Sequence, residues 1–218
     1  IPQTADKKID LAPIEYNLGK SIIFAAHSNL SGKVFDNIDL ENAVFEQANL
    51  QNSSFKNSNL ENAVLKNSNL SNVDFSSANL KHANLAWSDL SGVNLNFQNL
   101  FGANLSGIDL ANIPHSNIIL NNAVLSSANL SGMDLTKIEH SGMVLNGINC
   151  CNRLPTDLSN TNLSDTDLRN KNLIFTNLSG QDLSEHNLEQ TILSQSNLSN
   201  AKLPYINLSG KNFFKTNL

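Results

Sequence analysis

One histidine and two cysteines are the residues of this chain whose types could support chemistry together. His140 and Cys150 occupy equivalent repeat positions, and Cys151 follows directly. A cysteine beside a histidine can act as a nucleophile with its base or as half of a metal site. The sequence offers no third ligand at a zinc-type spacing, and His115 repeats the substitution without a cysteine nearby. We therefore interpret the pair as a buried histidine and a buried thiol, and predict no catalytic residues, no cofactor and no metal.

The elements that must position these residues belong to a repeat of five residues. A stretch such as ANLQN SSFKN SNLEN AVLKN SNLSN has one large residue in each unit, which we call the central position. This position recurs from Leu30 to Cys150 and again from Leu158 to Leu218, and it is nearly always Leu or Phe. Two residues earlier comes the small position, usually Ala, Ser or Thr, and Asn or Asp commonly lies between the two.

A period of five residues fits neither an amphipathic helix nor a long strand. It fits a chain that turns a corner every five residues and directs its central and small positions inward. Phe35, Phe55 and Phe75 are 20 residues apart, and four valines recur at the same interval or its multiples: Val44, Val64, Val124 and Val144. This slower period predicts a four-sided coil in which like residues stack from one coil to the next.

Units such as A-N-L-x-x and S-D-L-S-G resemble those of the pentapeptide-repeat family. The resemblance implies an all-β fold, a right-handed parallel quadrilateral β-helix of about nine to ten coils with an N-terminal cap. The motif residues are structural, so the resemblance specifies the fold far better than the function.

Four segments follow from the repeat pattern. Residues 1–29 precede the regular units and are expected to cap the first coil, with a short helical turn near Pro13 to Leu18. Residues 30–150 form a first solenoid block and residues 156–218 a second. Between them, the segment 151–155 shifts the frame, which we interpret as a three-residue insertion or an altered corner. Loops carry function often, although a tolerated slip would produce the same pattern.

Two features are candidates for protein contact. Trp87, Phe97 and Phe101 fall at outward positions within one short region, where a small apolar patch can bind a partner, although single exposed apolar residues are also common. The second candidate is the frame-shifting loop, which consists of Cys151, Asn152, Arg153, Leu154 and Pro155.

The charge distribution argues against direct nucleic-acid binding. The chain carries 14 basic and 19 acidic residues, a net charge of −5, and no basic stripe. Within the family, the quinolone-resistance and mycobacterial gyrase-inhibitor group presents an acidic rod that mimics DNA to a type II topoisomerase. Lys81 and Lys66 interrupt the acidic columns here, which weakens that interpretation. The candidate acidic columns are Glu41 with Glu61, Asp89 with Asp109, and Asp165 with Glu185.

The small position changes character in the second block. Threonine is frequent there, and four long polar residues depart from the family pattern: Lys171, Gln181, His186 and Lys211. We expect these long side chains to snorkel toward solvent at the corners.

A non-enzymatic protein-binding or scaffold role, with an unidentified protein partner, is the preferred function. The alternatives are a DNA-mimicking regulator of DNA gyrase and a bacterial effector or membrane-associated module whose address lies in further segments. No apolar run is long enough to cross a membrane. Two adjacent cysteines form no disulfide framework, which favours the cytoplasm, although a secreted or processed form stays open. The last coil has no cap, which favours a homodimer through that end.

Overall fold

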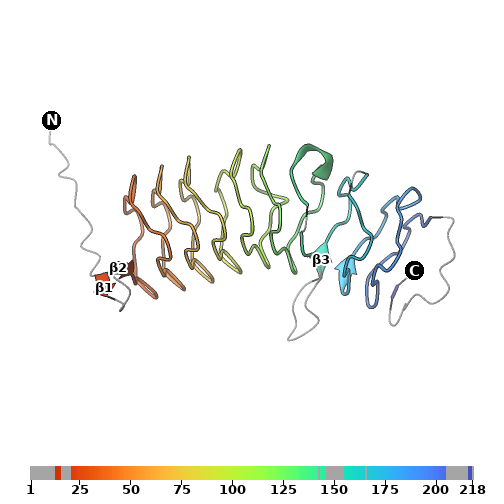
Figure 1. The fold of residues 1–218 in the computed structure, drawn as a ribbon, viewed down its shortest axis with the longest axis horizontal. Coiled ribbons are helices and arrows are strands. Elements are labelled where there is room, and N and C mark those ends of the chain that lie inside the picture. The colour runs from red at the N-terminus through yellow and green to blue at the C-terminus, as the bar shows by residue number, and fades with distance from the viewer. Residues whose placement is uncertain are drawn as a thin grey trace.

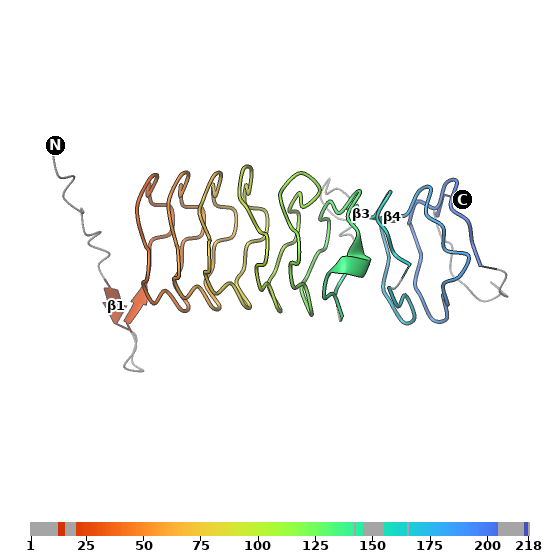
Figure 2. The ribbon, with the colours of Figure 1, turned by 90° about the horizontal axis from the view of Figure 1, so that it is seen from above.

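The computed structural model describes residues 13–15, 21–141, 143–145, 155–164, 166–204 and 216–217. These residues form an elongated rod of stacked four-sided coils, a right-handed quadrilateral β-helix (Figures 1 and 2). The regular elements are short: β1 (Pro13–Glu15), β2 (Ser21–Ile23), the 3-10 helix η1 (Leu135–Lys137), β3 (Thr156–Asp157) and β4 (Thr176–Asn177). The remaining pairing consists of isolated parallel bridges.

All but two of the bridges between described residues join residues 20 positions apart, from Phe24 with Val44 to Asn197 with Asn217. Each side of a coil contributes one paired residue between two corners, and so few strands exceed one residue. The 20-residue register confirms the predicted four-sided coil. The number of coils stays a prediction, because several segments lie outside the described residues.

Most described corners are hydrogen-bonded turns with one left-handed residue. At a typical corner, the amide of Ala43 donates to the carbonyl of Leu40 over 2.9 Å. Asn42, the third residue of this turn, has a φ of 62°. Asn and Gly tolerate positive φ best, which explains why they recur two residues after the central position.

The Asn or Asp before each central residue holds both the corner and the stack. The Oδ1 atom of Asn49 accepts a hydrogen bond from the amide of Gln51 two residues on, over 3.2 Å. The side-chain amide of Asn59 donates to Asp39 in the preceding coil over 2.9 Å. These side chains satisfy polar groups of neighbouring turns and coils, so their recurrence in the motif is structural.

The core is a continuous column of central and small positions. Phe35 and Phe55 stack with ring centroids 4.6 Å apart, and Phe55 and Phe75 with centroids 5.6 Å apart. Val44 pairs with Val64, and Val124 with Val144. The predicted columns are therefore confirmed. The valine columns face outward, and Val144 is 41% exposed. Burial of each central Leu or Phe side chain contributes about 2 kcal/mol before conformational entropy is subtracted.

Near the N-terminal end, the described residues differ from the expected helical turn. β1 pairs with β2 in an antiparallel arrangement, with Pro13 opposite Ile23. The expectation of a helical turn was therefore wrong at residues 13–15. The 20-residue register also extends back to Phe24, earlier than the expected first unit at Leu30. A capping role for residues 1–29 stays a prediction.

The register changes once along the rod. Asn129 pairs with Asp157 and Asp134 with Asn162, 28 residues apart rather than 20. This coil therefore holds eight extra residues, and 13 residues connect Leu145 to Leu158, where five connect neighbouring central positions elsewhere. The expected insertion of three residues was too short, because Leu158 takes the place that follows Leu145 in the coil.

Candidate functional site

The coil that absorbs the extra residues separates from the next coil on two of its four sides. The bridges of Asn129 and Asp134 keep the other two sides paired. No backbone–backbone hydrogen bond between described residues joins 139–145 to 166–172. The stacking ladder is thus interrupted along one corner of the rod.

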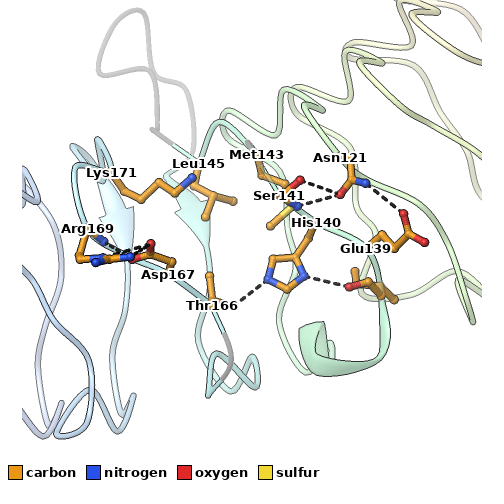
Figure 3. Close-up of a pocket in the computed structure, with 11 residues that line it drawn as sticks. Asn121, Glu139, His140, Ser141, Met143, Leu145, Thr166, Asp167, Arg169 and Lys171 are labelled. Carbon is orange, nitrogen blue, oxygen red and sulfur yellow. Dashed lines mark hydrogen bonds and ion pairs between the residues drawn. The ribbon is translucent and has the colours of Figure 1, made fainter.

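A cavity of about 560 Å³ occupies this interruption, and we call it the cleft (Figure 3). One wall comes from residues 138–145 and the other from residues 166–171. The volume lies within the range of small-ligand sites, about 300–1,000 Å³. The lining includes Asn121, His140, Leu145, Thr166, Arg169 and Lys171.

His140 bridges the two walls. Its Nδ1 atom lies 2.9 Å from the carbonyl oxygen of Ile138, and its Nε2 atom lies 3.2 Å from Oγ1 of Thr166 (Figure 3). A carbonyl only accepts, so Nδ1 carries a proton, and in the neutral ring Nε2 accepts from the threonine hydroxyl. His115 makes the same contact with the carbonyl of Ile113 over 2.7 Å.

These contacts give His140 an orienting role that requires no cysteine. Cys150 and Cys151 lie outside the described residues. Among the described residues, no group of three His, Cys, Asp or Glu side chains could hold a metal ion. In the same part of the chain, no helix is long and apolar enough to span a membrane.

The N-terminal wall is fixed by Asn121. Its Oδ1 atom accepts from the amide of Ser141 over 2.8 Å, and its Nδ2 atom donates to Oε2 of Glu139 over 3.0 Å. The carboxylate of Glu139 therefore already has a hydrogen-bond donor.

The C-terminal wall carries a salt bridge between Arg169 and Asp167. The guanidinium donates through Nε over 2.9 Å to Oδ1 of Asp167 and through an amino nitrogen over 2.7 Å to its Oδ2. These charge-assisted hydrogen bonds lower the pKa of Asp167 to about 2. The same contact raises the pKa of Arg169. Both side chains are more than half exposed, so the pair contributes little to stability.

Lys171 is the remaining charged group in the cleft. It occupies the small position before Leu173 but is only half-buried, and its side chain extends toward Leu145 on the opposite wall (Figure 3). It makes no ion pair with any residue that the structure describes.

Snorkelling was the wrong prediction for two of the long polar residues in the second block. Gln181 is buried, and its Nε2 atom donates to the carbonyl of Leu158 over 2.5 Å. His186 is also buried, and its Nε2 atom lies 2.8 Å from the carbonyl oxygen of Leu163. Both side chains reach inward to the preceding coil, because a central carbonyl there has a free lone pair. Lys211 lies outside the described residues.

The three outward aromatic residues do not form one patch. The three residues follow the central positions Leu85, Leu95 and Leu100, which lie on three different sides of the coil. The three aromatic side chains therefore occupy three different corners. Trp87 covers Gly107 of the next coil, where an added Cβ atom would lie 2.0 Å from the ring. Phe101 meets the edge of His82 with centroids 5.4 Å apart. Phe97 alone is strongly exposed, at 75%.

The acidic columns are also dispersed over the rod. Glu41 and Glu61 belong to one corner, and Glu61 accepts from Asn79 over 3.0 Å. Asp89 and Asp109 lie on another side and line a cavity of about 260 Å³. Glu185 lies at a third corner beside a cavity of about 360 Å³. Asp165 is outside the described residues.

Of the frame-shifting loop, only Pro155 lies among the described residues, and it is half-buried. Cys151, Asn152, Arg153 and Leu154 fall outside them. Sequence reasoning missed the cleft, whose lining residues are up to 50 positions apart in the chain. One signal was present, since a lysine at position 171 breaks the pattern of small positions.

Two family models match the chain. The model of the pentapeptide repeat region matches residues 29–105, and the model of pentapeptide repeats in eight copies matches residues 99–138, 156–195, 172–210 and 191–218. Together they cover most of the sequence. No curated protein sequence matches the chain significantly.

Several solved structures are similar to this chain. One is HetL, a pentapeptide repeat protein involved in heterocyst differentiation regulation from the cyanobacterium Nostoc sp. strain PCC 7120. It is 26% identical, with 88% of this chain and 87% of HetL covered and a TM-score of 0.36. Another is QnrB1, a plasmid-mediated fluoroquinolone resistance protein. It is 14% identical, with 89% of this chain and 90% of QnrB1 covered and a TM-score of 0.38.

Proposed function

Because this chain belongs to the pentapeptide-repeat family, in which the repeat supplies structure rather than chemistry, we propose that it is a non-enzymatic scaffold that binds another protein. The binding surface is the cleft between residues 138–145 and 166–171. The observation that carries this proposal is the interrupted ladder. Among the described residues, two strand edges there lack the backbone partners that equivalent residues have one coil earlier. The described residues of 73–80 and 93–99, and of 162–168 and 181–187, also lack such bonds, but only at the cleft does a cavity of about 560 Å³ lie between the coils.

Unpaired strand edges favour association with another chain. Open backbone N–H and C=O groups are a template for an added strand, and peptide recognition often uses this geometry. Outside the cleft, the described interior of the rod is filled with Leu, Phe and Ala, which leaves little room for a reaction there. The cleft combines open backbone groups with a cavity and a cation that has no ion pair among the described residues, and these features favour the docking of another chain.

Blocking the cleft tests this role. Ser141→Phe places an aromatic ring at the cleft wall, and Phe101 shows that this column of the repeat accommodates such a ring. Lys81→Phe makes the same change three coils earlier and is the matched control. Affinity capture from lysate of the source organism should lose a specific partner with Ser141→Phe and keep it with Lys81→Phe. Equal capture by both variants would contradict the proposal.

A regulator of DNA gyrase is the second candidate function. One column favours it: the side that carries Asp89, Asp109 and Asp157 has only Asn at its other described positions and no basic residue. Three carboxylates among ten positions give a sparse match to the charge of DNA. A supercoiling assay, with and without a quinolone, tests this candidate. Inhibition of gyrase or rescue from the drug would support it, and no effect at large protein excess would remove it.

Two further proposals concern the compartment and the oligomeric state. We propose the cytoplasm as the compartment, because two adjacent cysteines are typical of reducing conditions. A homodimer through the C-terminal end is the second, and sedimentation at several protein concentrations tests it.

A further inference from the structure

We infer that the cleft binds an extended, acidic peptide segment, whose backbone pairs with the parted coils and whose carboxylate binds Lys171. This inference rests on the proposed function, because it names the class of partner that the scaffold takes.

Within the described residues, two backbone amides of the N-terminal wall lack the acceptors that equivalent amides have one coil earlier. One coil earlier, the amide of Leu120 donates to the carbonyl of Glu139 over 2.6 Å, and that of Leu125 to Val144 over 2.9 Å. The equivalent amides of His140 and Leu145 have no backbone acceptor among the described residues. Buried backbone groups without partners are costly, so these amides favour a ligand that presents carbonyl oxygens at strand spacing.

The facing wall also has backbone groups that do not pair with the described part of the preceding coil. There the amides and carbonyls of Asp167 and Asn172 would normally pair with the preceding coil, and none of them does so within the described residues. An extended peptide presents N–H and C=O groups along both of its edges. The walls also touch directly, through His140 with Thr166 over 3.2 Å. The hydroxyl of Thr176 likewise donates to the carbonyl of Leu145 over 3.1 Å. A strand that enters the cleft can pair with the open edge of a wall, which a small anion cannot do.

The charged side chains of the cleft differ in their partners. Arg169 is engaged by Asp167, and Glu139 accepts from Asn121. Lys171 makes no ion pair among the described residues, and its charge contributes only the smallest of the effects that lower the pKa of Asp167. A half-buried ammonium gains most from a carboxylate, because an ion pair in a partly dry site is screened less than at the surface.

The cleft also offers apolar surface to the opposite face of a bound strand. Met143 and Leu145 line the same cavity and supply apolar surface beside Lys171. Successive side chains of an extended peptide point to opposite faces. The cleft therefore fits a segment in which acidic and apolar residues alternate.

Titration of the isotope-labelled full chain, followed by NMR, tests the inference. The probe is the blocked peptide acetyl-Ser-Glu-Val-Glu-Ser-amide, and the matched probe replaces both glutamates with lysine. We expect the acidic peptide to shift the amide signals of His140, Leu145, Asp167 and Asn172 in a saturable manner, and the basic peptide to leave them unchanged.

Two variants separate the cleft from general charge. Lys171→Gln keeps the length of the side chain and should weaken binding of the acidic peptide at least fivefold. Lys81→Gln removes the same charge from an exposed corner outside the cleft, and should leave the affinity unchanged.

Three results would overturn the inference: no saturable shift with the acidic peptide, equal affinity of Lys171→Gln and the wild-type chain, or the same amide shifts with acetate alone. The last result would show an anion site without strand pairing. If partner capture still depends on Ser141 while the peptide fails to bind, the scaffold function stands and only the acidic-strand inference is lost.

Discussion

The two solenoid blocks share one coil geometry but are held together differently. In the first block, fully buried alanines fill many of the small positions: Ala43, Ala63, Ala83 and Ala103. In the second block, the same positions carry polar side chains that bond to a central carbonyl of the preceding coil, as Thr161 does with Leu130 over 2.8 Å. The ladder is interrupted across the junction of the blocks, where the cleft lies.

This difference shows two ways to stack the same coil. A small apolar residue allows close packing and depends on a continuous ladder for register. A polar residue contributes a directional bond worth about 0.5–1.5 kcal/mol and fixes the register through the side chain. The second block therefore keeps its alignment beyond the interruption, where the backbone ladder alone would be weaker.

The largest expected difference concerns the core on either side of the interruption. Leu105 is fully buried between two paired coils, so Leu105→Ala should destabilise the chain by about 2–5 kcal/mol. Leu145 is also buried but lines the cleft, where the wall can relax into the cavity, so Leu145→Ala should have a smaller effect. Urea unfolding of both variants measures this. Equal losses would show that the two regions are packed alike.

The next effect concerns tight and open corners. Gly107 and Gly180 have φ values of 71° and 70°, so alanine is strained at both, by about 1–2 kcal/mol. At Gly107 the new Cβ atom would also collide with Trp87, whereas nothing lies within 4 Å at Gly180. We expect Gly107→Ala to lower thermal stability more than Gly180→Ala.

The background Trp87→Ser isolates the collision. In this background, Gly107→Ala should have the same effect as Gly180→Ala, because only backbone strain is left. Persistence of the extra loss without the indole ring would contradict the stacking of Trp87 on Gly107.

The sequence predicts the regular part of the fold because each repeat position has a local cause. Asn or Gly two residues after the central position supplies positive φ, as at Asn42 and Gly107. The Asn before the central position closes the corner, as Asn49 does. Such causes act within five residues, so the period alone indicates corners, columns and the 20-residue register.

The cleft could not be predicted in the same way. The sequence shows a frame shift, but whether the coil absorbs three or eight residues depends on which later unit pairs with Leu130. That choice is a competition between long-range registers, and Leu158 takes the place. Thr166 and His140 meet only as a result. Lys171 was visible as an exception, but nothing local indicated the cavity beside it.

A smaller effect concerns the polar small positions. Thr161→Val keeps the shape of the side chain and removes the hydroxyl that donates to Leu130, so it should destabilise the second block by about 1 kcal/mol. Ala63→Ser in the first block is the reciprocal change, because it adds a hydroxyl where alanine now packs without one. Hydrogen exchange at the neighbouring amides localises each effect. Faster exchange along the whole rod after Thr161→Val would contradict a local role.

The smallest effect concerns two aspartates with lowered pKa values, one in each block. Hydrogen bonds from the hydroxyl and the amide of Ser91 lower the pKa of Asp89, without any cation. Asp167 owes its pKa of about 2 chiefly to the hydrogen-bonded guanidinium of Arg169. Since the unfolded value is about 3.9, each group stabilises the fold above about pH 4, and this contribution is lost as the pH falls through the folded value.

Salt separates these two causes, because screening weakens an exposed ion pair more than a hydrogen bond from a neutral hydroxyl. In a carboxyl NMR titration, added salt should raise the pKa of Asp167 more than that of Asp89. Arg169→Gln should return the pKa of Asp167 toward the ordinary range of aspartate and leave Asp89 unchanged. Equal responses of the two aspartates would mean that the cleft wall, like the first block, is held by neutral hydrogen bonds, and that Arg169 is free to take part in binding.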